Sequence, residues 1–319
     1  MKPQLIIFYG GVDQEREVSL KSYDAITRAL EGADYNIQSI EVTPEAKWLR
    51  DGKEVEVGQA LLWADYAWIA GHGTYMEDGT LQRILDEHRV PYNGSDAISS
   101  QIAFSKGATK DLFEKHGIKT PTYKRYDTKG SKAKSIAEHI FRDIPQPCVI
   151  KPDRGGSSLG VSIAHTFEET LSAIEQAIEI GARHILAEEY IGNCEATVGV
   201  VQGMRDIEYY ALPAVEIVPS KEFFDYEAKY EGAVEEICPS SFSDEVKQEL
   251  EALAIRVHQI LGLDDYSRTD FIIHPSRGIF VLEVNTLPGM ANTSLLPQEL
   301  EAVGITLQEF CEHIIARKI

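Results

Sequence analysis

The sequence has few cysteines, no long hydrophobic run and a deficit of basic residues. Its four cysteines are spread over 319 residues and form no C-x-x-C pair, which argues against a disulfide scaffold or a zinc site. No apolar run approaches the ~20 residues of a membrane span. The first apolar run, residues 5–9, is shorter than the roughly 7–15 residues of a signal-peptide core. We therefore expect a cytoplasmic protein with no membrane segment.

The charge balance excludes a further group of functions. The chain has 31 Lys plus Arg against 51 Asp plus Glu, a formal net charge of −20. Binding to a phosphate backbone needs a surplus of basic residues, and so does binding to an anionic membrane surface. We therefore expect neither nucleic acid nor membrane as a partner. The hydrophobic fraction of 43% is ordinary for a folded protein, and the length predicts two or more domains.

Several well-known catalytic motifs are also missing. The sequence has no Walker A loop, no H-E-x-x-H and no Rossmann G-x-G-x-x-G, which argues against a zinc protease and a nicotinamide dehydrogenase. Residues 156–160 match the G-x-S-x-G of serine hydrolases. That motif needs a tight turn from strand to helix, but here the preceding strand ends near residue 150 and residues 161–163 look extended. A serine hydrolase is thus a weak alternative, to be tested by phosphonate labelling of Ser158.

The first third of the chain alternates apolar strands with amphipathic helices, a pattern that predicts a parallel sheet covered by helices. The predicted elements are strands at 5–9, 37–42 and 66–70 and helices at 15–30 and 80–88. Ligands bind at the carboxyl ends of the strands in such sheets. Gly10-Gly11 and Gly71-His72-Gly73 both follow predicted strands, so we expect them on that edge.

The rest of the chain is more mixed, and predicts an α+β arrangement. Residues 121–144 are polar and irregular with one helix near 135–141, and residues 219–239 have no clear period and predict a long loop. The remaining predicted elements are strands at 148–150 and 185–191, helices at 167–180, 244–261 and 307–317, and a hairpin at 267–285.

The hairpin brings four polar residues together. Its turn signal at residues 275–278 places Asp270 opposite Glu283 and Arg268 opposite Asn285, with all four side chains on one face. The other face then carries the residues of an apolar core, namely Thr269, Phe271, Ile273, Phe280, Leu282 and Val284. Opposed Cβ atoms lie ~5 Å apart, so the two carboxylates are within reach of one ion.

Two carboxylates and an amide oxygen are hard ligands suited to Mg²⁺, which often bridges to substrate phosphates. Asp270, Glu283 and Asn285 are therefore candidate metal ligands. The alternative is a solvated polar face on which Arg268 neutralises the acids. We favour the metal because the rest of this face is mostly apolar. A shift of register by one residue would remove the argument.

Other candidate residues are less specific when each is considered alone. The Gly- and Ser-rich loop at 155–160 follows a strand, and small residues let backbone N–H groups approach phosphate oxygens. Lys106 and Lys151 could pair with nucleotide phosphates, or they could be ordinary surface lysines. Glu15 could bind a ligand or complement the dipole of the helix that it begins. His72 could likewise bind a ligand or have only a structural role.

Taken together, the motifs resemble the D-alanine–D-alanine ligase family of ATP-grasp enzymes over nearly the whole chain. The resemblance rests on motifs that occur in the family's order, namely Gly10-Gly11, Glu-Arg-Glu-Val-Ser-Leu at 15–20, His72-Gly73, Glu-Asp-Gly at 77–79, Lys151-Pro152, the loop at 156–160, Asp-Tyr-Glu-Ala-Lys-Tyr at 225–230, Ser-Arg-Thr-Asp at 267–270, Glu-Val-Asn-Thr-Leu-Pro-Gly-Met at 283–290 and Ser294-Leu295.

The resemblance implies an N-terminal α/β substrate domain, residues 1–105, with a parallel sheet. Two ATP-grasp subdomains follow at residues 106–189 and 190–319, with a lid loop near 219–239. It also implies a reaction in which one D-alanine attacks the ATP γ-phosphate to give an acyl phosphate. The amine of a second D-alanine then displaces phosphate, and the D-alanyl-D-alanine formed serves peptidoglycan precursor synthesis.

The resemblance assigns roles residue by residue. The implied catalytic residues are Glu15, Ser157, Tyr230, Arg268, Gly289 and Ser294. Substrate binding is implied for Glu15, His72, Lys229, Tyr230, Arg268, Ser294 and Leu295. Nucleotide binding is implied for Lys106, Lys151, Gly156, Ser157, Ser158, Glu188, Ile191 and Glu195. Metal binding is implied for Asp270, Glu283 and Asn285.

The family also implies ATP as co-substrate, two Mg²⁺ or Mn²⁺ ions and a homodimer. Tyr23 and Met76 stand where the family usually has glycine, close to the expected first-substrate region, so they bear on substrate identity. The alternatives are therefore a ligase that takes D-serine or D-lactate as second substrate and a nucleotide-binding relative that has lost catalysis. The pair Lys229-Tyr230 favours D-alanine over D-lactate.

Overall fold

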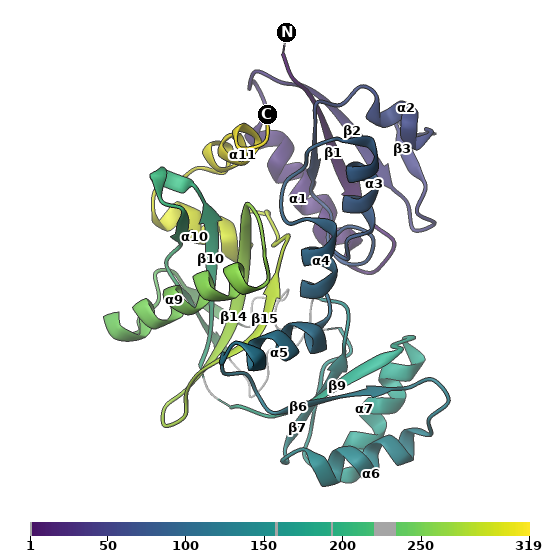
Figure 1. Ribbon diagram of the computed structural model, residues 1–319, viewed down its shortest axis with the longest axis vertical. Coiled ribbons are helices and arrows are strands. Elements are labelled where there is room, and N and C mark those ends of the chain that lie inside the picture. The colour runs from purple at the N-terminus through teal and green to yellow at the C-terminus, as the bar shows by residue number, and fades with distance from the viewer. Residues whose placement is uncertain (1, 157–158, 193, 220–233) are drawn as a thin grey trace.

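The computed structural model describes residues 2–156, 159–192, 194–219 and 234–319. It contains three sheets with helices on their faces, the mixed α/β class that the sequence predicts (Figure 1). No helix among the described residues has the length and apolar character needed to cross a membrane. All four cysteines lie in the described part of the chain and are free.

The first sheet has five strands in the order β4-β3-β2-β1-β5, and β1, β2 and β5 are parallel as predicted. Its strands are β1 (Gln4–Gly10), β2 (Asn36–Val42), β3 (Trp48–Arg50), β4 (Lys53–Glu54) and β5 (Tyr66–Ile69). The helices that follow in sequence are α1 (Arg16–Ala29), α2 (Val57–Leu61), α3 (Thr80–His88) and α4 (Ala97–Ala103). Gly10 ends β1 at φ +92°, where a Cβ would lie 2.4 Å from the Val42 carbonyl oxygen, so only glycine fits there.

The second sheet is antiparallel, in the order β6-β9-β7-β8. Its elements are β6 (Tyr123–Asp127), β7 (Cys148–Pro152), β8 (Ser162–Ala164) and β9 (His184–Glu189), with helices α6 (Ala133–Asp143) and α7 (Phe167–Glu179) packed on it. Strand β6 corrects the expectation of an irregular segment at 121–144. It is an edge strand with largely exposed side chains, so it lacks the apolar alternation by which strands are recognised.

The third sheet has six strands in the order β13-β12-β10-β14-β15, with β11 paired to β10. The strands are β10 (Cys194–Gln202), β11 (Tyr209–Ala211), β12 (Val215–Pro219), β13 (Val234–Ile237), β14 (Tyr266–His274) and β15 (Gly278–Asn285). Strand β13 corrects the C-terminal part of the loop expected at 219–239, whose residues 220–233 lie outside the described chain. Helices α5 (Lys106–Lys115) and α9 (Asp244–Ile260) share one apolar core with this sheet (Figure 1).

The C-terminal helices α10 (Leu295–Ala302) and α11 (Leu307–Ala316) pack back toward the first sheet. Leu296, Phe310 and Ile314 belong to the same buried cluster as Leu5 and Trp68. In Figure 1 helix α11 accordingly lies beside α1 at the N-terminal end of the molecule. This packing brings the C-terminal helices into the core of the first sheet.

Candidate functional site

The polar quartet of the hairpin forms as the sequence predicts. Asp270 pairs with Glu283 and Arg268 pairs with Asn285 in the antiparallel ladder between β14 and β15. Beyond Asp270 the register shifts, because a bulge at Leu282 makes Phe271 pair with Val281. A bulge adds one residue to one strand and so exchanges its faces.

The bulge corrects the predicted core face beyond Asp270. Val281 and Ile279 pack with Phe271 in the main core of the third sheet. Phe280 and Leu282 instead lie on the opposite face, where they pack with Ile272 and Ile191 in a small separate cluster. The predicted nucleotide residue Ile191 thereby belongs to a small apolar cluster on the hairpin that carries the polar quartet. Glu195, on β10, lies opposite Ile272 in the ladder between β10 and β14.

Asp270 is held by hydrogen bonds from three neighbouring residues. Its Oδ1 accepts from Thr197 Oγ1 at 2.6 Å and from Arg268 Nε at 3.1 Å. Its Oδ2 accepts from Arg268 Nη2 at 3.2 Å and from Asn285 Nδ2 at 3.1 Å. The two-point contact with Arg268 fixes both side chains in one plane. Burial lowers the pKa of Arg268, but the charge of Asp270 and its hydrogen bond, together with the charges of other nearby acids, outweigh this effect and raise the pKa.

Lys106 connects the hairpin to the glycine-rich loop. Its Nζ lies 3.5 Å from Glu283 Oε2 and donates to the Gly155 carbonyl oxygen at 2.5 Å. A pocket opens between these groups and the N-terminal sheet. It is lined by Glu15, Glu77, Ala103, Phe104, Lys106, Gly155, Gly156, Glu283, Val284, Asn285 and Thr286.

A buried ion cluster lies beside the loop, on the second sheet and α5. Glu188 Oε1 is 3.0 Å from Nζ of both Lys110 and Lys151. Burial lowers the pKa of Lys110 to about 8. Burial also lowers the pKa of Lys151, but the charge and hydrogen bond of Glu188, together with the charges of Glu283 and Glu195, outweigh this effect and raise the pKa. Sequence reasoning proposed Lys151 and Glu188 but missed Lys110, because one lysine on an ordinary helix carries no signal of burial.

On the opposite side of the pocket, His72 links the first sheet to the segment after β15. Its Nδ1 lies 2.8 Å from the Leu287 carbonyl oxygen, so Nδ1 carries the proton and donates. Its Nε2 then accepts from Ser22 Oγ at 2.8 Å. Burial lowers the pKa of His72 to about 4, so the ring is neutral at pH 7. The Met290 N–H in turn donates to Ser22 Oγ at 3.0 Å.

Two carboxyl groups meet at the same edge. Glu15 is buried, and its Oε1 lies 2.8 Å from the point where a Cβ on Gly156 would be. Glu77 accepts the N–H groups of Gly73 at 2.7 Å and Leu287 at 3.3 Å. Burial, and then the charge of Glu15, raises the pKa of Glu77 to about 8. Glu77 belongs to the Glu-Asp-Gly motif, but sequence reasoning gave it no role.

Gly289 and Ser294 lie side by side at the start of α10. A Cβ on Gly289 would be 2.8 Å from Ser294 Oγ, so only glycine leaves the serine hydroxyl room. Ser294 is the N-cap residue of α10, and Leu295 begins the helix. Four predicted site residues, Ser157, Ser158, Lys229 and Tyr230, lie outside the described residues.

Tyr23 and Met76, the two bulky residues expected near the first substrate, both pack against neighbouring side chains or backbone. Tyr23 stacks on Tyr9 with ring centroids 4.1 Å apart, and its hydroxyl lies 2.8 Å from Ser39 Oγ. Its neighbour Ser22 is the residue that faces His72. Met76 is fully buried and covers Gly71, where a Cβ would be 2.3 Å from Met76 Cγ.

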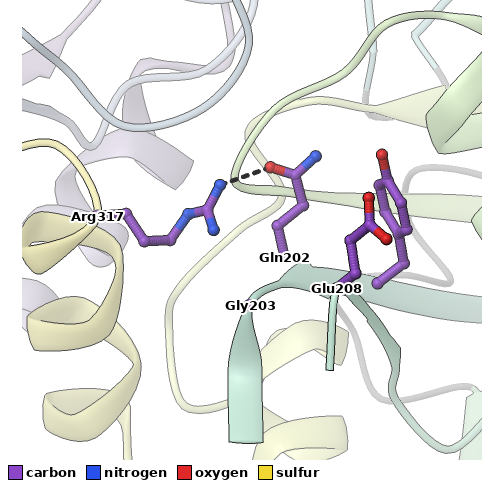
Figure 2. Close-up of a pocket in the computed structure, with 5 residues that line it drawn as sticks. Gln202, Gly203, Glu208 and Arg317 are labelled. Atoms are coloured by element: carbon purple, nitrogen blue, oxygen red, sulfur yellow. Dashed lines mark hydrogen bonds between the residues drawn. The ribbon is translucent and has the colours of Figure 1, made fainter. Parts of the chain in front are cut away.

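Figure 2 shows a second pocket, which lies on the C-terminal side of the molecule and contains none of the predicted site residues. It is lined by Gln202, Gly203, Glu208, Tyr209 and Arg317. The Arg317 guanidinium donates to Gln202 Oε1 at 2.7 Å and also pairs with Asp265, so its charge is already balanced within the protein.

Known proteins resemble this chain along almost all of its length. The D-alanine–D-alanine ligase of Desulfotalea psychrophila is 37% identical over 316 residues, which cover 98% of this chain and 94% of the relative. The VanG D-Ala:D-Ser ligase of Enterococcus faecalis is 25% identical with a TM-score of 0.86, and covers 99% of both chains.

A structure of the Bacillus anthracis D-alanine–D-alanine ligase complexed with ATP is 26% identical with a TM-score of 0.79, covering 98% of this chain and 96% of that one. The profile described as the C-terminus of D-ala D-ala ligase matches residues 112–316. The chain therefore belongs to the D-alanine–D-alanine ligase family of ATP-grasp enzymes.

Proposed function

We propose that this protein joins two D-alanine molecules, with conversion of ATP to ADP and phosphate, to supply D-alanyl-D-alanine for peptidoglycan precursors. One observation carries the proposal. A single pocket is lined on one side by the acids Glu15 and Glu77, and on the other by Lys106, Glu283 and Asn285. The carboxylate of Glu15 suits an ammonium group and Lys106 suits phosphate, so the pocket has one side for each substrate.

In the first step, Glu15 would hold the ammonium group of the first D-alanine. The neutral His72, fixed between Ser22 and Leu287, would shape this subsite. The carboxylate of that D-alanine attacks the γ-phosphorus, the bond to the β–γ bridging oxygen breaks, and ADP leaves. Lys106 and Lys151 would contact the phosphates, Gly156 with Ser157 and Ser158 would cover them, and Glu188, Ile191 and Glu195 would hold adenine and ribose.

The hairpin quartet suits a divalent ion by the chemistry of its donors. Asp270 and Glu283 offer carboxylate oxygens and Asn285 offers an amide oxygen, which are the ligand types that Mg²⁺ and Mn²⁺ take. When bound, Mg²⁺ or Mn²⁺, as one ion or two, would neutralise charge on the phosphate oxygens. Glu283 is now paired with Lys106, so the lysine would exchange this carboxylate for phosphate.

In the second step, the amine of the second D-alanine attacks the acyl phosphate carbonyl and inorganic phosphate leaves. Arg268 and the Gly289 N–H would stabilise the oxyanion, since fixed donors at a developing charge are a large catalytic term. Ser294 and Leu295 would hold the carboxylate of the second substrate. Lys229 and Tyr230 would complete the site with Ser157.

The domain boundaries of 1–105, 106–189 and 190–319, the cytoplasmic location and the homodimer remain part of this proposal.

Phosphate release with ATP, Mg²⁺ and D-alanine tests the activity. We expect turnover that requires D-alanine and a dipeptide product visible by mass spectrometry. Turnover no higher than the blank without amino acid would refute the proposal. Glu283→Ala should abolish turnover, because it removes a carboxylate ligand, and a wild-type rate in that variant would overturn the metal assignment.

A D-alanine–D-serine ligase is the second candidate, supported by the likeness to VanG at a TM-score of 0.86. Side-by-side kinetics with D-alanine, D-serine and D-lactate as second substrate separate these activities. A higher kcat/KM for D-serine than for D-alanine would replace the first proposal with this one.

A further inference from the structure

Helix α10 carries a fully buried acid, Glu299, which packs on the same face of the third sheet as the side chain of Arg268. Its side chain has 0% exposure. Glu299 Oε1 accepts the Gly199 backbone N–H at 2.7 Å. Among the residues that the structure describes, Oε2 has no hydrogen-bond partner. Burying an unsatisfied polar atom destabilises the folded state, an effect that an apolar residue would avoid at this position.

The space for this carboxyl group exists because residue 199 is a glycine. A Cβ there would lie 2.8 Å from Glu299 Oε2 and 2.6 Å from Leu296 Cδ1. The Gly199 carbonyl oxygen accepts the Leu212 N–H on the same edge of β10. Glu299 therefore supplies the partner that the Gly199 N–H finds nowhere else in the described ladder, and an apolar side chain would leave this N–H unpaired.

Gly199 is also the cross-strand neighbour of Arg268. The ladder between β10 and β14 pairs Gly199 with Arg268 and Thr197 with Asp270. Figure 1 shows α10 alongside β10, with β14 next in the sheet. The contact of Glu299 with Gly199 thus joins α10, which begins after Ser294, to β10, the strand that pairs with the Arg268 strand β14.

The charge of this acid fits a positioning role. Burial raises the pKa of Glu299 to about 8, so the group is mostly protonated at pH 7. The positive charge of Arg268 acts in the opposite direction and the negative charge of Asp270 adds to the effect of burial. A neutral acid leaves the charge of Arg268 committed to Asp270 and to the reacting oxygen.

We propose that Glu299 is a positioning residue for the second-substrate half of the site, holding Ser294 at a fixed distance from Arg268 through its hydrogen bond to Gly199. This inference rests on the proposed ligase function. Ser294 and Arg268 lie on different elements, α10 and β14, and the second substrate must contact both at once. A shift of α10 along β10 would move one group without the other.

The test compares two substitutions of similar volume in the full-length enzyme. Glu299→Gln keeps an oxygen acceptor for the Gly199 N–H, and Glu299→Leu removes it. We expect Glu299→Leu to raise the KM for the second D-alanine about tenfold, which corresponds to the loss of one hydrogen bond. The KM for ATP should stay unchanged. Glu299→Gln should restore the KM of the wild type.

The outcomes separate this inference from the proposed function. Absence of D-alanine-dependent turnover in the wild type refutes the ligase function itself. An active wild type together with an unchanged D-alanine KM in Glu299→Leu overturns the role of Glu299, even if its melting temperature falls. A KM raised equally in Glu299→Gln also overturns it. If Glu299→Leu does not fold, Glu299→Asp withdraws the acceptor by one methylene, and an unaltered KM there has the same meaning.

Discussion

The buried cluster of Lys110, Lys151 and Glu188 gives the sharpest prediction about stability. Glu188 is 2% exposed and Lys110 is 0% exposed, so neither charge is well solvated. Substitution of Glu188 by Gln keeps the shape of the side chain but leaves two buried ammonium groups without a countercharge. Removing one partner of a buried ion pair costs about 3–5 kcal/mol.

Loss of a proton by a lysine sets an upper limit on the free-energy cost of burying its unpaired charge. A lysine can escape burial of its charge by losing its proton, and with an unfolded-state pKa of about 10.4 this costs roughly 4.6 kcal/mol at pH 7. We therefore expect Glu188→Gln to lose about 3–5 kcal/mol of unfolding free energy at pH 7. Above about pH 10.4 Lys110 is neutral in both states, so its part of the difference from the wild type should shrink.

The measurement is a urea titration followed by circular dichroism, with hydrogen exchange of the β9 amides as a local probe. The matched control is Glu54→Gln. Glu54 pairs with Lys47 at 2.8 Å, but the two side chains are 62% and 54% exposed, and exposed pairs contribute little. We expect no measurable loss in the control. If both variants lost the same small amount of unfolding free energy, the claim that the buried cluster depends on the charge of Glu188 would be refuted.

Two other predictions concern groups outside this cluster. Burial lowers the pKa of His258 to about 4, so the unfolded chain binds more protons between pH 6.5 and 4, and stability falls as the pH drops through this window. His258→Gln should flatten the pH dependence of urea unfolding there by about 3 kcal/mol, and an unaltered slope would contradict this. Gly71→Ala should destabilise the protein, because its Cβ would lie 2.3 Å from Met76 Cγ. Met76→Ala should relieve that loss, and a double-mutant cycle should show a coupling of about 0.5–3 kcal/mol, whereas additive losses would disprove the contact.

Local patterns determined a large part of this protein. The strands of the first sheet follow from short apolar runs, and the hairpin that carries Asp270 and Glu283 follows from its turn signal. The direct pairing of these two residues also needs the bulge at Leu282, because His274 pairs with Gly278 at the turn. The bulge at Leu282 was not predictable, because the pattern on either side of it is apolar on both faces. Strand β6 was missed for the opposite reason, since an exposed edge strand has no apolar face.

The tertiary structure alone decided the contacts between distant segments. His72 meets Leu287 across 215 residues and Glu299 meets Gly199 across 100 residues. Neither sequence position differs locally from an ordinary surface histidine or glutamate. In the same way, Lys110 on helix α5 is paired with Glu188, which lies on strand β9 of the second sheet.

The sequence by itself determined the family, the hairpin that brings Asp270 and Glu283 together and the residue types that suit phosphate, ammonium and metal. Only the folded chain decided which of these groups are buried, which are protonated and which face one another. The physical reason is that backbone periodicity acts over a few residues, whereas burial and charge pairing depend on whichever segments the packing of the three sheets brings together.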